Sequence, residues 1–94
     1  MLKALRAGIT LMFYYTYVLV SKKDKSIYIG WSPDLKSRLF AHNKGLVKST
    51  RSKLPLKLVY YEACLSEKKA ILREKQLKTG FGRKYIKNRI DIAG

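Results

Sequence analysis

The feature that most constrains the fold is a run of aromatic and β-branched residues, followed by a short polar turn and a second such run. Residues 14–21 read YYTYVLVS, residues 22–25 are polar, and residues 26–30 read SIYIG. Such runs are typical of strands, and their close spacing predicts an antiparallel hairpin. Because side chains alternate along a strand, Tyr15, Tyr17 and Leu19 share one face of the first strand, and Tyr28 and Gly30 share one face of the second.

Helical and strand patterns follow the hairpin. A helix is expected over residues 33–43, with Ser32 as a candidate N-cap, Pro33 in the first turn and Gly45 after the end. The later segments are a basic loop (44–53), a third strand (56–63), a second helix (66–79) stopped by Gly80, and a short basic helix (83–90). The mixture indicates an α/β chain of the α+β type. One domain over residues 12–94 and a flexible extension over residues 1–11 are expected.

The chain is strongly basic. Twenty-one lysines and arginines stand against six acidic residues, a formal net charge of +15, and no acid lies between Asp34 and Glu62. A surface of one sign attracts polyanions, and nucleic acid is favoured over an anionic membrane. The residues expected to follow a phosphate backbone are Lys44, Lys48, Arg51 and Lys53.

The cysteine content and the apolar runs favour the cytoplasm. Cys64 is the single cysteine, so an internal disulfide is ruled out, which suits a reducing compartment. The apolar run over residues 11–20 is shorter than the roughly twenty residues of a bilayer-spanning helix. The basic first residues lack a small-residue cleavage site, so neither export nor membrane insertion is expected.

One acidic residue stands out in the basic C-terminal part. Glu74 is the only acid among residues 68–90, and on the helical period it falls in line with Ala70 and Leu77. A carboxylate beside a core is costly unless it is paired or binds a cation. The sequence therefore leaves two readings, a metal site that acts on phosphates, or an ion pair with Arg73 or Lys78.

Several short motifs occur in a fixed order. Tyr15-Thr16-Tyr17 lies eleven residues before Tyr28-Ile29-Gly30, and DLKSRL, HN, PLKLVYYE and AILRE follow, the last ending at Glu74. In this order and spacing the motifs resemble the GIY-YIG nuclease family, in particular its small stand-alone members related to the N-terminal domain of the excinuclease C subunit. The resemblance runs over about residues 14–90.

The resemblance implies a small three-stranded antiparallel sheet flanked by about three helices, and a cut in a nucleic-acid backbone that depends on one Mg²⁺ or Mn²⁺ per site. By motif position, Tyr17 and Tyr28 would lie beside the attacking water and the scissile phosphate. The other matching positions are Arg38 as the phosphate contact, His42 at the helix position held by histidine or tyrosine, and Glu74 as the metal ligand.

Two positions depart from the family pattern. Tyr15 stands where the first motif has glycine, which indicates that the backbone there is not unusually close-packed. The asparagine that many members place after the glutamate has no clean counterpart, and Asn88 is the nearest candidate.

The residue types agree with these roles on chemical grounds. Mg²⁺ is commonly held by one or two carboxylates together with substrate oxygens, so Glu74 alone is sufficient. The fork of Arg38 can contact a phosphate in a bidentate way that lysine cannot. A phenol is a poor base at its usual pKa of about 10, so Tyr17 or Tyr28 is either acidified by a nearby cation or only orients the water.

Two functions remain open at this point. The first is a structure- or lesion-directed endonuclease of DNA repair or recombination, with RNA as an open alternative substrate, and the second is a non-catalytic nucleic-acid-binding module. Trp31 either packs against the start of the following helix or stacks on an unpaired base. A small domain has little surface for reading sequence, so specificity is expected from nucleic-acid shape or from a protein partner.

Overall fold

The computed structural model describes residues 11–90. Its elements are β1 (Tyr14–Ser21), β2 (Ile27–Ser32), α1 (Leu35–Asn43), the short 3-10 helix η2 (Arg51–Lys53), β3 (Leu56–Cys64), α2 (Glu67–Leu77) and α3 (Gly80–Lys87). The strands form one antiparallel sheet in the order β2-β1-β3. The expected α+β fold is confirmed, while the extension expected over residues 1–11 lies, apart from Leu11, outside the described residues.

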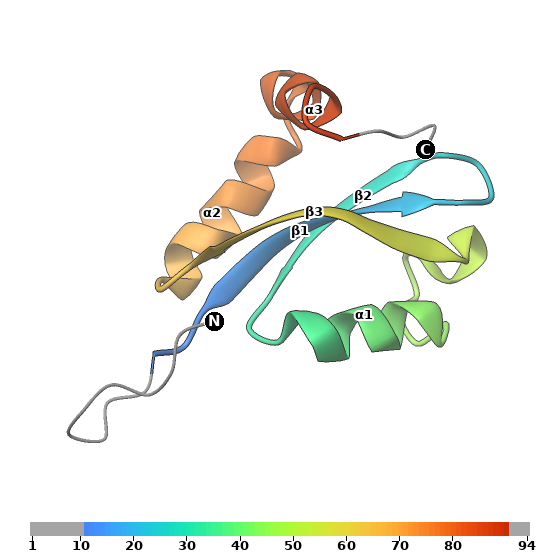
Figure 1. Ribbon diagram of the computed structural model, residues 1–94, viewed down its shortest axis with the longest axis horizontal. Helices are drawn as coiled ribbons and strands as arrows, with labels where there is room; N and C mark the ends of the chain where they lie inside the picture. Colours follow the sequence, from blue (N-terminus) through green and yellow to red (C-terminus); the bar gives the residue numbers. More distant parts are fainter. Residues whose placement is uncertain (1–10, 91–94) are drawn as a thin grey trace.

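The sheet separates two apolar layers. Figure 1 shows α1 on one face of the strands and α2 and α3 on the other. On the α1 face the buried Tyr17 and Leu19 pack with Leu35 and Leu39. On the opposite face Val18 and Ile29 pack with buried side chains of the two C-terminal helices, Leu77 and Ile86. The alternation predicted for β1 is therefore confirmed, and β1 contributes to both layers.

The helix α2 is fastened to the sheet by polar contacts as well as by its buried Ala70 and Leu77. The hydroxyl of the buried Thr16 donates to the carbonyl of Ala70 at 2.9 Å. The guanidinium of Arg73 donates two hydrogen bonds of 2.9 Å to the carboxylate of Glu62 on β3. These contacts hold α2 against both β1 and β3.

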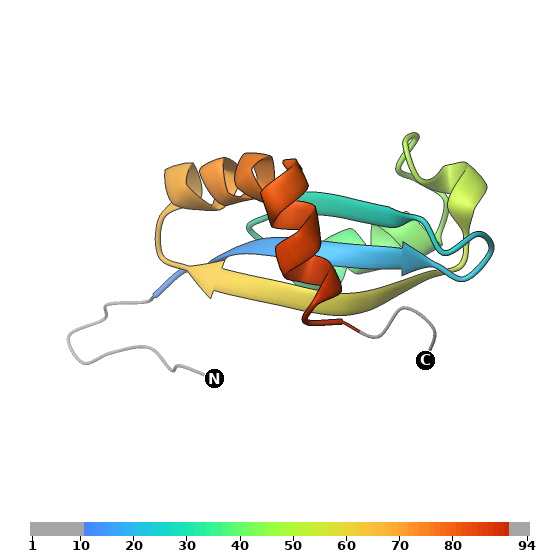
Figure 2. The same cartoon turned by 90° about the horizontal axis from the view of Figure 1, so that it is seen from above.

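The helix α3 begins earlier than the sequence suggested. Gly80, expected to stop the preceding helix, is the first residue of α3, because the Thr79 hydroxyl caps this helix by accepting from the Gly82 amide at 3.1 Å. A Cβ on Gly82 would overlap the Gln76 carbonyl oxygen. The absence of a side chain at Gly82 therefore lets α3 cross the end of α2 closely, as Figure 2 shows.

The start of α1 also differs from the expectation. The N-cap is Asp34 rather than Ser32, and Pro33 precedes the helix instead of opening it. The Asp34 carboxylate accepts from both the amide and the hydroxyl of Ser37, at 3.1 and 2.9 Å. The Ser32 hydroxyl instead binds the backbone of Asp34. Asp34 prevails because its two oxygens satisfy two donors of the first turn.

Among residues 11–90, no helix combines the length and the apolar character needed to cross a membrane.

Candidate active site

Three aromatic rings meet between the sheet and α1. The Tyr17 and Tyr28 rings lie 6.3 Å apart between centroids, and the His42 ring lies 5.8 Å from the first and 5.1 Å from the second. Both histidine contacts have edge-on geometry, which favours the attraction between a ring edge and a neighbouring face. Three of the expected site residues therefore form one cluster.

A chain of hydrogen bonds runs through this cluster. The Arg38 Nε donates to the Tyr17 hydroxyl at 3.4 Å, and that hydroxyl lies 2.9 Å from His42 Nε2. His42 Nδ1 lies 2.7 Å from the Thr50 hydroxyl, which donates to the Val47 carbonyl at 3.5 Å. Arginine can only donate and a carbonyl can only accept, so the ends set the direction of the whole chain. Tyr17 then donates to Nε2, and Nδ1 carries the histidine proton.

Burial decides the protonation of the two central groups. Burial raises the pKa of Tyr17 to about 12, against the smaller opposing effect of the hydrogen bond from Arg38. The buried environment and then the charge of Arg38 lower the pKa of His42 below its ordinary value. The resting pair is therefore a neutral phenol and a neutral imidazole, and the effect of Arg38 is too small to bring the pKa of Tyr17 below its ordinary value.

The neutrality of His42 predicts a loss of stability in mild acid. The unfolded chain takes up a proton on His42 near its ordinary pKa of about 6.5, whereas the folded chain resists protonation to lower pH. The free energy of unfolding should therefore fall as the pH is lowered from 7 to 5.5, by no more than about 1.4 kcal/mol per pH unit for one proton. Urea unfolding at each pH measures this slope.

A matched variant isolates the effect, because His42 is the only histidine of the chain. The pKa values of Asp24, Asp34 and Glu62 are lowered in the folded state, so these carboxylates titrate below the chosen window. His42→Gln should be less stable than the wild type at pH 7 but should show almost no slope. An equal slope in both proteins would contradict the assignment.

The absence of a side chain at Gly30 leaves space for the Tyr17 ring. The two residues are partners across β1 and β2, and a Cβ on Gly30 would lie 2.7 Å from the Tyr17 hydroxyl and 3.0 Å from the Tyr28 ring. Contacts this short are repulsive, so any side chain at position 30 must displace the phenol. The glycine is thus required by the close packing of the two site tyrosines.

Glu74 lies in the other layer, on the face of the sheet opposite α1 (Figure 1). It lies on α2, in line with the buried Ala70 and Leu77 as the helical period predicted, and its side chain is 17% exposed. Its carboxylate pairs with Lys78 at 3.3 Å, while Arg73 is engaged by Glu62. Its charge contributes to the raised pKa of Tyr17, as the smallest of the five influences on that group. The structure therefore does not bring Glu74 into the ring cluster. Tyr17, Tyr28, Arg38 and His42 lie on the α1 face of the sheet, whereas Glu74 lies on α2 over the opposite face (Figure 1).

The donor set limits what ion could bind. Within residues 11–90, no three histidine, cysteine or acidic side chains gather as a metal cage. The Lys78 partner is half exposed and held by one contact, so it can leave the Glu74 carboxylate. A single accessible carboxylate fits a hard divalent cation that takes its other ligands from water and from substrate oxygens.

The basic loop after α1 adjoins the cluster. A cavity of about 160 Å³ lies between Tyr28 and this loop, with Thr50 and Lys53 in its lining. Lys53 forms an ion pair with Asp24, and the Lys44 ammonium lies 5.4 Å from the centre of the Phe40 ring. The two remaining basic residues expected to contact phosphate, Lys48 and Arg51, are exposed.

The two remaining candidates lie apart from the ring cluster. Strand alternation places the half-buried Trp31 on the Ile29 face, on which α2 packs, rather than against the start of α1. Asn88 is exposed at the C-cap of α3.

Sequence reasoning missed two residues that organise the site. Thr50 orients His42, and the Asn43 side chain accepts from the Leu56 amide at 3.0 Å and donates to the Leu56 carbonyl at 3.2 Å. Asn43 thereby ties the end of α1 to the start of β3. An asparagine directly after the site histidine was a visible signal, whereas no pattern pointed to Thr50.

The comparison with protein families decides the classification. Residues 13–87 match the model described as the GIY-YIG catalytic domain. The chain belongs to the GIY-YIG family. The family supports a nuclease-like function on a nucleic-acid substrate, and this GIY-YIG chain places Tyr17, Tyr28, Arg38 and His42 in one cluster.

Curated relatives of this GIY-YIG chain are named UPF0213 proteins. One from Clostridium perfringens is 43% identical over 65 residues, 68% of this chain and 69% of the relative. One from Streptococcus pneumoniae is also 43% identical over 65 residues, 68% and 65% of the two chains. One from Staphylococcus saprophyticus is 36% identical over 75 residues, 79% and 90% of the two chains. The matched region thus spans 65–90% of the length of these three relatives.

Proposed function

We propose that this chain is a divalent-metal-dependent endonuclease that hydrolyses phosphodiester bonds in DNA. The observation that carries the proposal is the directed hydrogen-bond chain from Arg38 through Tyr17 and His42 to Thr50. Such a chain offers a phosphate-binding cation at one end and a neutral base behind a phenol. In phosphodiester hydrolysis such a cation can stabilise the charge on the phosphate, and such a base can accept the proton of the attacking water.

Arg38 is the group that would meet the phosphate first. It is half-buried, and its contact with the Tyr17 hydroxyl is long at 3.4 Å, whereas Tyr17 and His42 are fully buried. A charge-assisted, bidentate bond to a phosphate is stronger than this contact. In our proposal Arg38 turns onto the non-bridging phosphate oxygens, and its departure opens the Tyr17 hydroxyl to a water molecule.

The Tyr17 and His42 pair would then carry the proton of the attacking water. As the water oxygen bonds to phosphorus, Tyr17 accepts the water proton and passes its own proton to His42 Nε2. The bond to the leaving oxygen breaks at the same time, and that oxygen takes a proton from solvent water. A relay of this kind never requires a free phenolate, which the raised pKa of Tyr17 disfavours. The Nδ1 hydrogen bond to Thr50 holds the imidazole in the accepting tautomer.

Glu74 would hold the divalent ion, Mg²⁺ or Mn²⁺, after Lys78 has released the carboxylate. When bound, the ion would supply positive charge to the phosphoryl oxygens during the displacement. One carboxylate with water and substrate oxygens is enough for such an ion, so the proposal is of one ion per site.

The substrate surface would be the basic loop together with the ring cluster. Lys48 and Arg51 are exposed beside the cavity that adjoins Tyr28, and the formal charge of +15 gives salt-dependent attraction to phosphates. We propose a structure- or lesion-directed role in DNA repair or recombination in the cytoplasm, with specificity supplied by nucleic-acid shape or by a protein partner. An RNA of equal sequence serves as the comparison substrate.

Arg38→Lys tests the proposal, because it keeps the charge and removes the fork. The wild type should cleave supercoiled plasmid or branched DNA with Mg²⁺ and should be inactive with EDTA. Arg38→Lys should lower kcat/KM by about 10²-fold, within the range for loss of one transition-state donor. Arg83→Lys on α3 is the matched control and should cleave like the wild type.

The binding-module alternative makes a different prediction for the same proteins. A module without catalysis would bind DNA in a salt-dependent way and would give no product with any metal. If the wild type and Arg38→Lys cleave DNA equally, or if cleavage continues in EDTA, a contaminating nuclease is responsible. Either result would contradict the proposed role of this site.

A further inference from the structure

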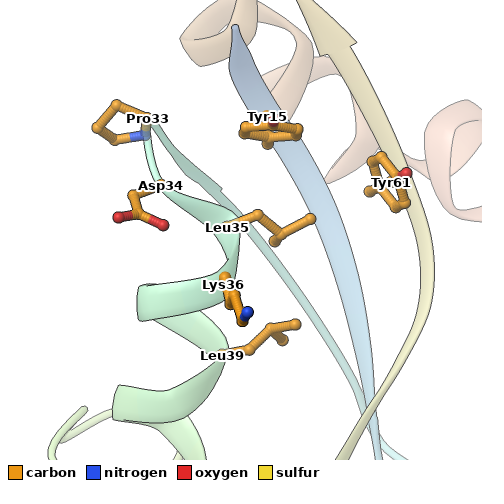
Figure 3. Close-up of a pocket in the computed structure, with 7 residues that line it drawn as sticks. All are labelled: Tyr15, Pro33, Asp34, Leu35, Lys36, Leu39 and Tyr61. Atoms are coloured by element: carbon orange, nitrogen blue, oxygen red, sulfur yellow. The ribbon is translucent and has the colours of Figure 1, made fainter. Parts of the chain in front are cut away.

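A pocket of about 350 Å³ lies between the sheet and the first turns of α1. Figure 3 shows Tyr15 and Tyr61 on neighbouring strands, and Leu35 and Leu39 extending from α1 toward them. The pocket opens to solvent, and Tyr61 is 54% exposed. Other large apolar side chains of the described residues are also exposed, but Tyr61 lines a pocket together with a second aromatic ring, so it is a candidate contact for a ligand.

The lining indicates what kind of ligand the pocket accepts. The whole chain carries a formal charge of +15, but the charged residues that line this pocket are one acid, Asp34, and one base, Lys36. The Asp34 carboxylate would repel a phosphate, and it already accepts two hydrogen bonds from Ser37. The remaining walls are aromatic and aliphatic. The pocket therefore suits an uncharged, flat group better than a phosphate.

The two tyrosine rings leave room for such a group. Their centroids are 6.0 Å apart and their planes are inclined by 59°, so Tyr15 does not stack on the face of Tyr61. A nucleobase can stack on an exposed tyrosine face regardless of its sequence identity, a contact worth about 1–3 kcal/mol per base.

The pocket lies directly beside the candidate active site. Tyr15 precedes Tyr17 by two residues on the same face of β1, a separation of about 7 Å along the strand. Leu35 and Leu39 line the pocket and also pack against the Tyr17 cluster, and Arg38 lies between them on α1. A group held in the pocket is thus a near neighbour of a phosphate held by Arg38.

We propose that this pocket binds one unpaired nucleobase of the cleaved strand, adjacent to the scissile phosphate. The inference rests on the proposed function for the identity of the strand, and it assigns Tyr61 as the stacking residue and Tyr15 as the side wall. A continuous duplex offers no such base unless it is extruded from the stack. The substrate class is therefore a nucleic acid with an unpaired base beside the cut.

The test measures binding in EDTA, so it is independent of cleavage. The ligands are a short DNA with a single 2-aminopurine between abasic residues, and an entirely abasic DNA of equal length and charge. The wild type should bind the first about 10-fold more tightly, with quenching of the 2-aminopurine fluorescence. Tyr61→Ala should lose both the preference and the quenching, and Tyr61→Phe should keep both.

Phe81→Ala is the matched control, because Phe81 is a 92% exposed aromatic residue on α3. It should retain the preference. If the wild type binds the two DNAs equally, the proposal is overturned. The pocket would then be assigned to an apolar side chain of a partner protein. A preference that survives Tyr61→Ala, or that disappears in Phe81→Ala, would also overturn the proposal.

The outcomes separate this inference from the proposed function. A preference for the DNA with a base, without cleavage of any DNA, would support the base-binding pocket and contradict the proposed nuclease activity. Cleavage without such a preference would support the nuclease activity and contradict the base-binding pocket. If Tyr61→Ala does not fold, Tyr61→Leu takes its place and should likewise lose the preference and the quenching.

Discussion

Replacing Glu74 with glutamine should abolish cleavage of plasmid or branched DNA in Mg²⁺. The amide is nearly isosteric but carries no charge, so the divalent ion would lose the carboxylate that we propose holds it. Metal stabilisation of charge on a phosphoryl group is worth several kcal/mol, and each 1.4 kcal/mol is tenfold in rate. We therefore expect kcat/KM to fall by about 10³-fold or more, measured by product formation over a range of Mg²⁺ concentrations.

Glu67→Gln provides the matched control on the same helix. Glu67 is an exposed acid in the first turn of α2, and its replacement removes one charge without touching the site. This variant should cleave DNA at close to the wild-type rate. Glu74→Gln should retain salt-dependent DNA binding, because the basic loop is unchanged. Cleavage by Glu74→Gln within a few-fold of the wild type would exclude Glu74 as the metal ligand.

Gly30→Ala should remove most of the activity although it adds only a methyl group. The added Cβ would lie 2.7 Å from the Tyr17 hydroxyl, and the buried phenol cannot yield without breaking its contacts with His42 and Arg38. General acid–base catalysis contributes about 10² to 10⁴ in rate, so we expect a loss of about 10³-fold in kcat. Overpacking should also lower the free energy of unfolding by about 1–3 kcal/mol.

Gly80→Ala separates the steric effect from the general effect of replacing glycine. No atom lies within 4 Å of a Cβ built on Gly80, so this variant should keep full activity and at least wild-type stability. Steady-state cleavage, together with circular dichroism to verify the fold, measures both variants. If Gly30→Ala keeps a wild-type kcat with an intact fold, the packed position of Tyr17 is not needed for the chemistry.

Strand and helix periodicity predicted the parts of the site that depend on single elements. Alternation along β1 placed Tyr17 with Leu19, and the helical repeat placed Glu74 with Ala70 and Leu77, both as observed. The sequence did not show that these two residues belong to opposite layers of the sheet. That relation depends on how α2 returns over β1, which is decided by tertiary contacts such as Thr16 with Ala70.

Loop-dependent features could not be predicted. Thr50 reaches His42 because the chain over residues 44–53 folds back toward α1, and no periodic signal describes such a path. The starts of α1 and α3 were also misplaced. Ser32 and Asp34 are both good caps by residue type, and the choice between them follows from which side chain can reach the Ser37 donors.

The two-sided character of β1 determines where insertions are tolerated. The neighbouring residues Thr16 and Tyr17 contact different helices, Thr16 bonding to α2 and Tyr17 to His42 on α1. Inserting or deleting one residue within β1 would exchange the faces of these side chains, so both contacts would be lost together. The exposed turn over residues 22–25 is free of this alternation, and its ties to the loop are the Asp24–Lys53 ion pair and the hydrogen bonds of Lys22 and Lys23 to backbone carbonyls. A chain of this design can accept added loops at the tip of its hairpin, for example to carry an affinity tag or a fluorophore, while its central strand must keep its length.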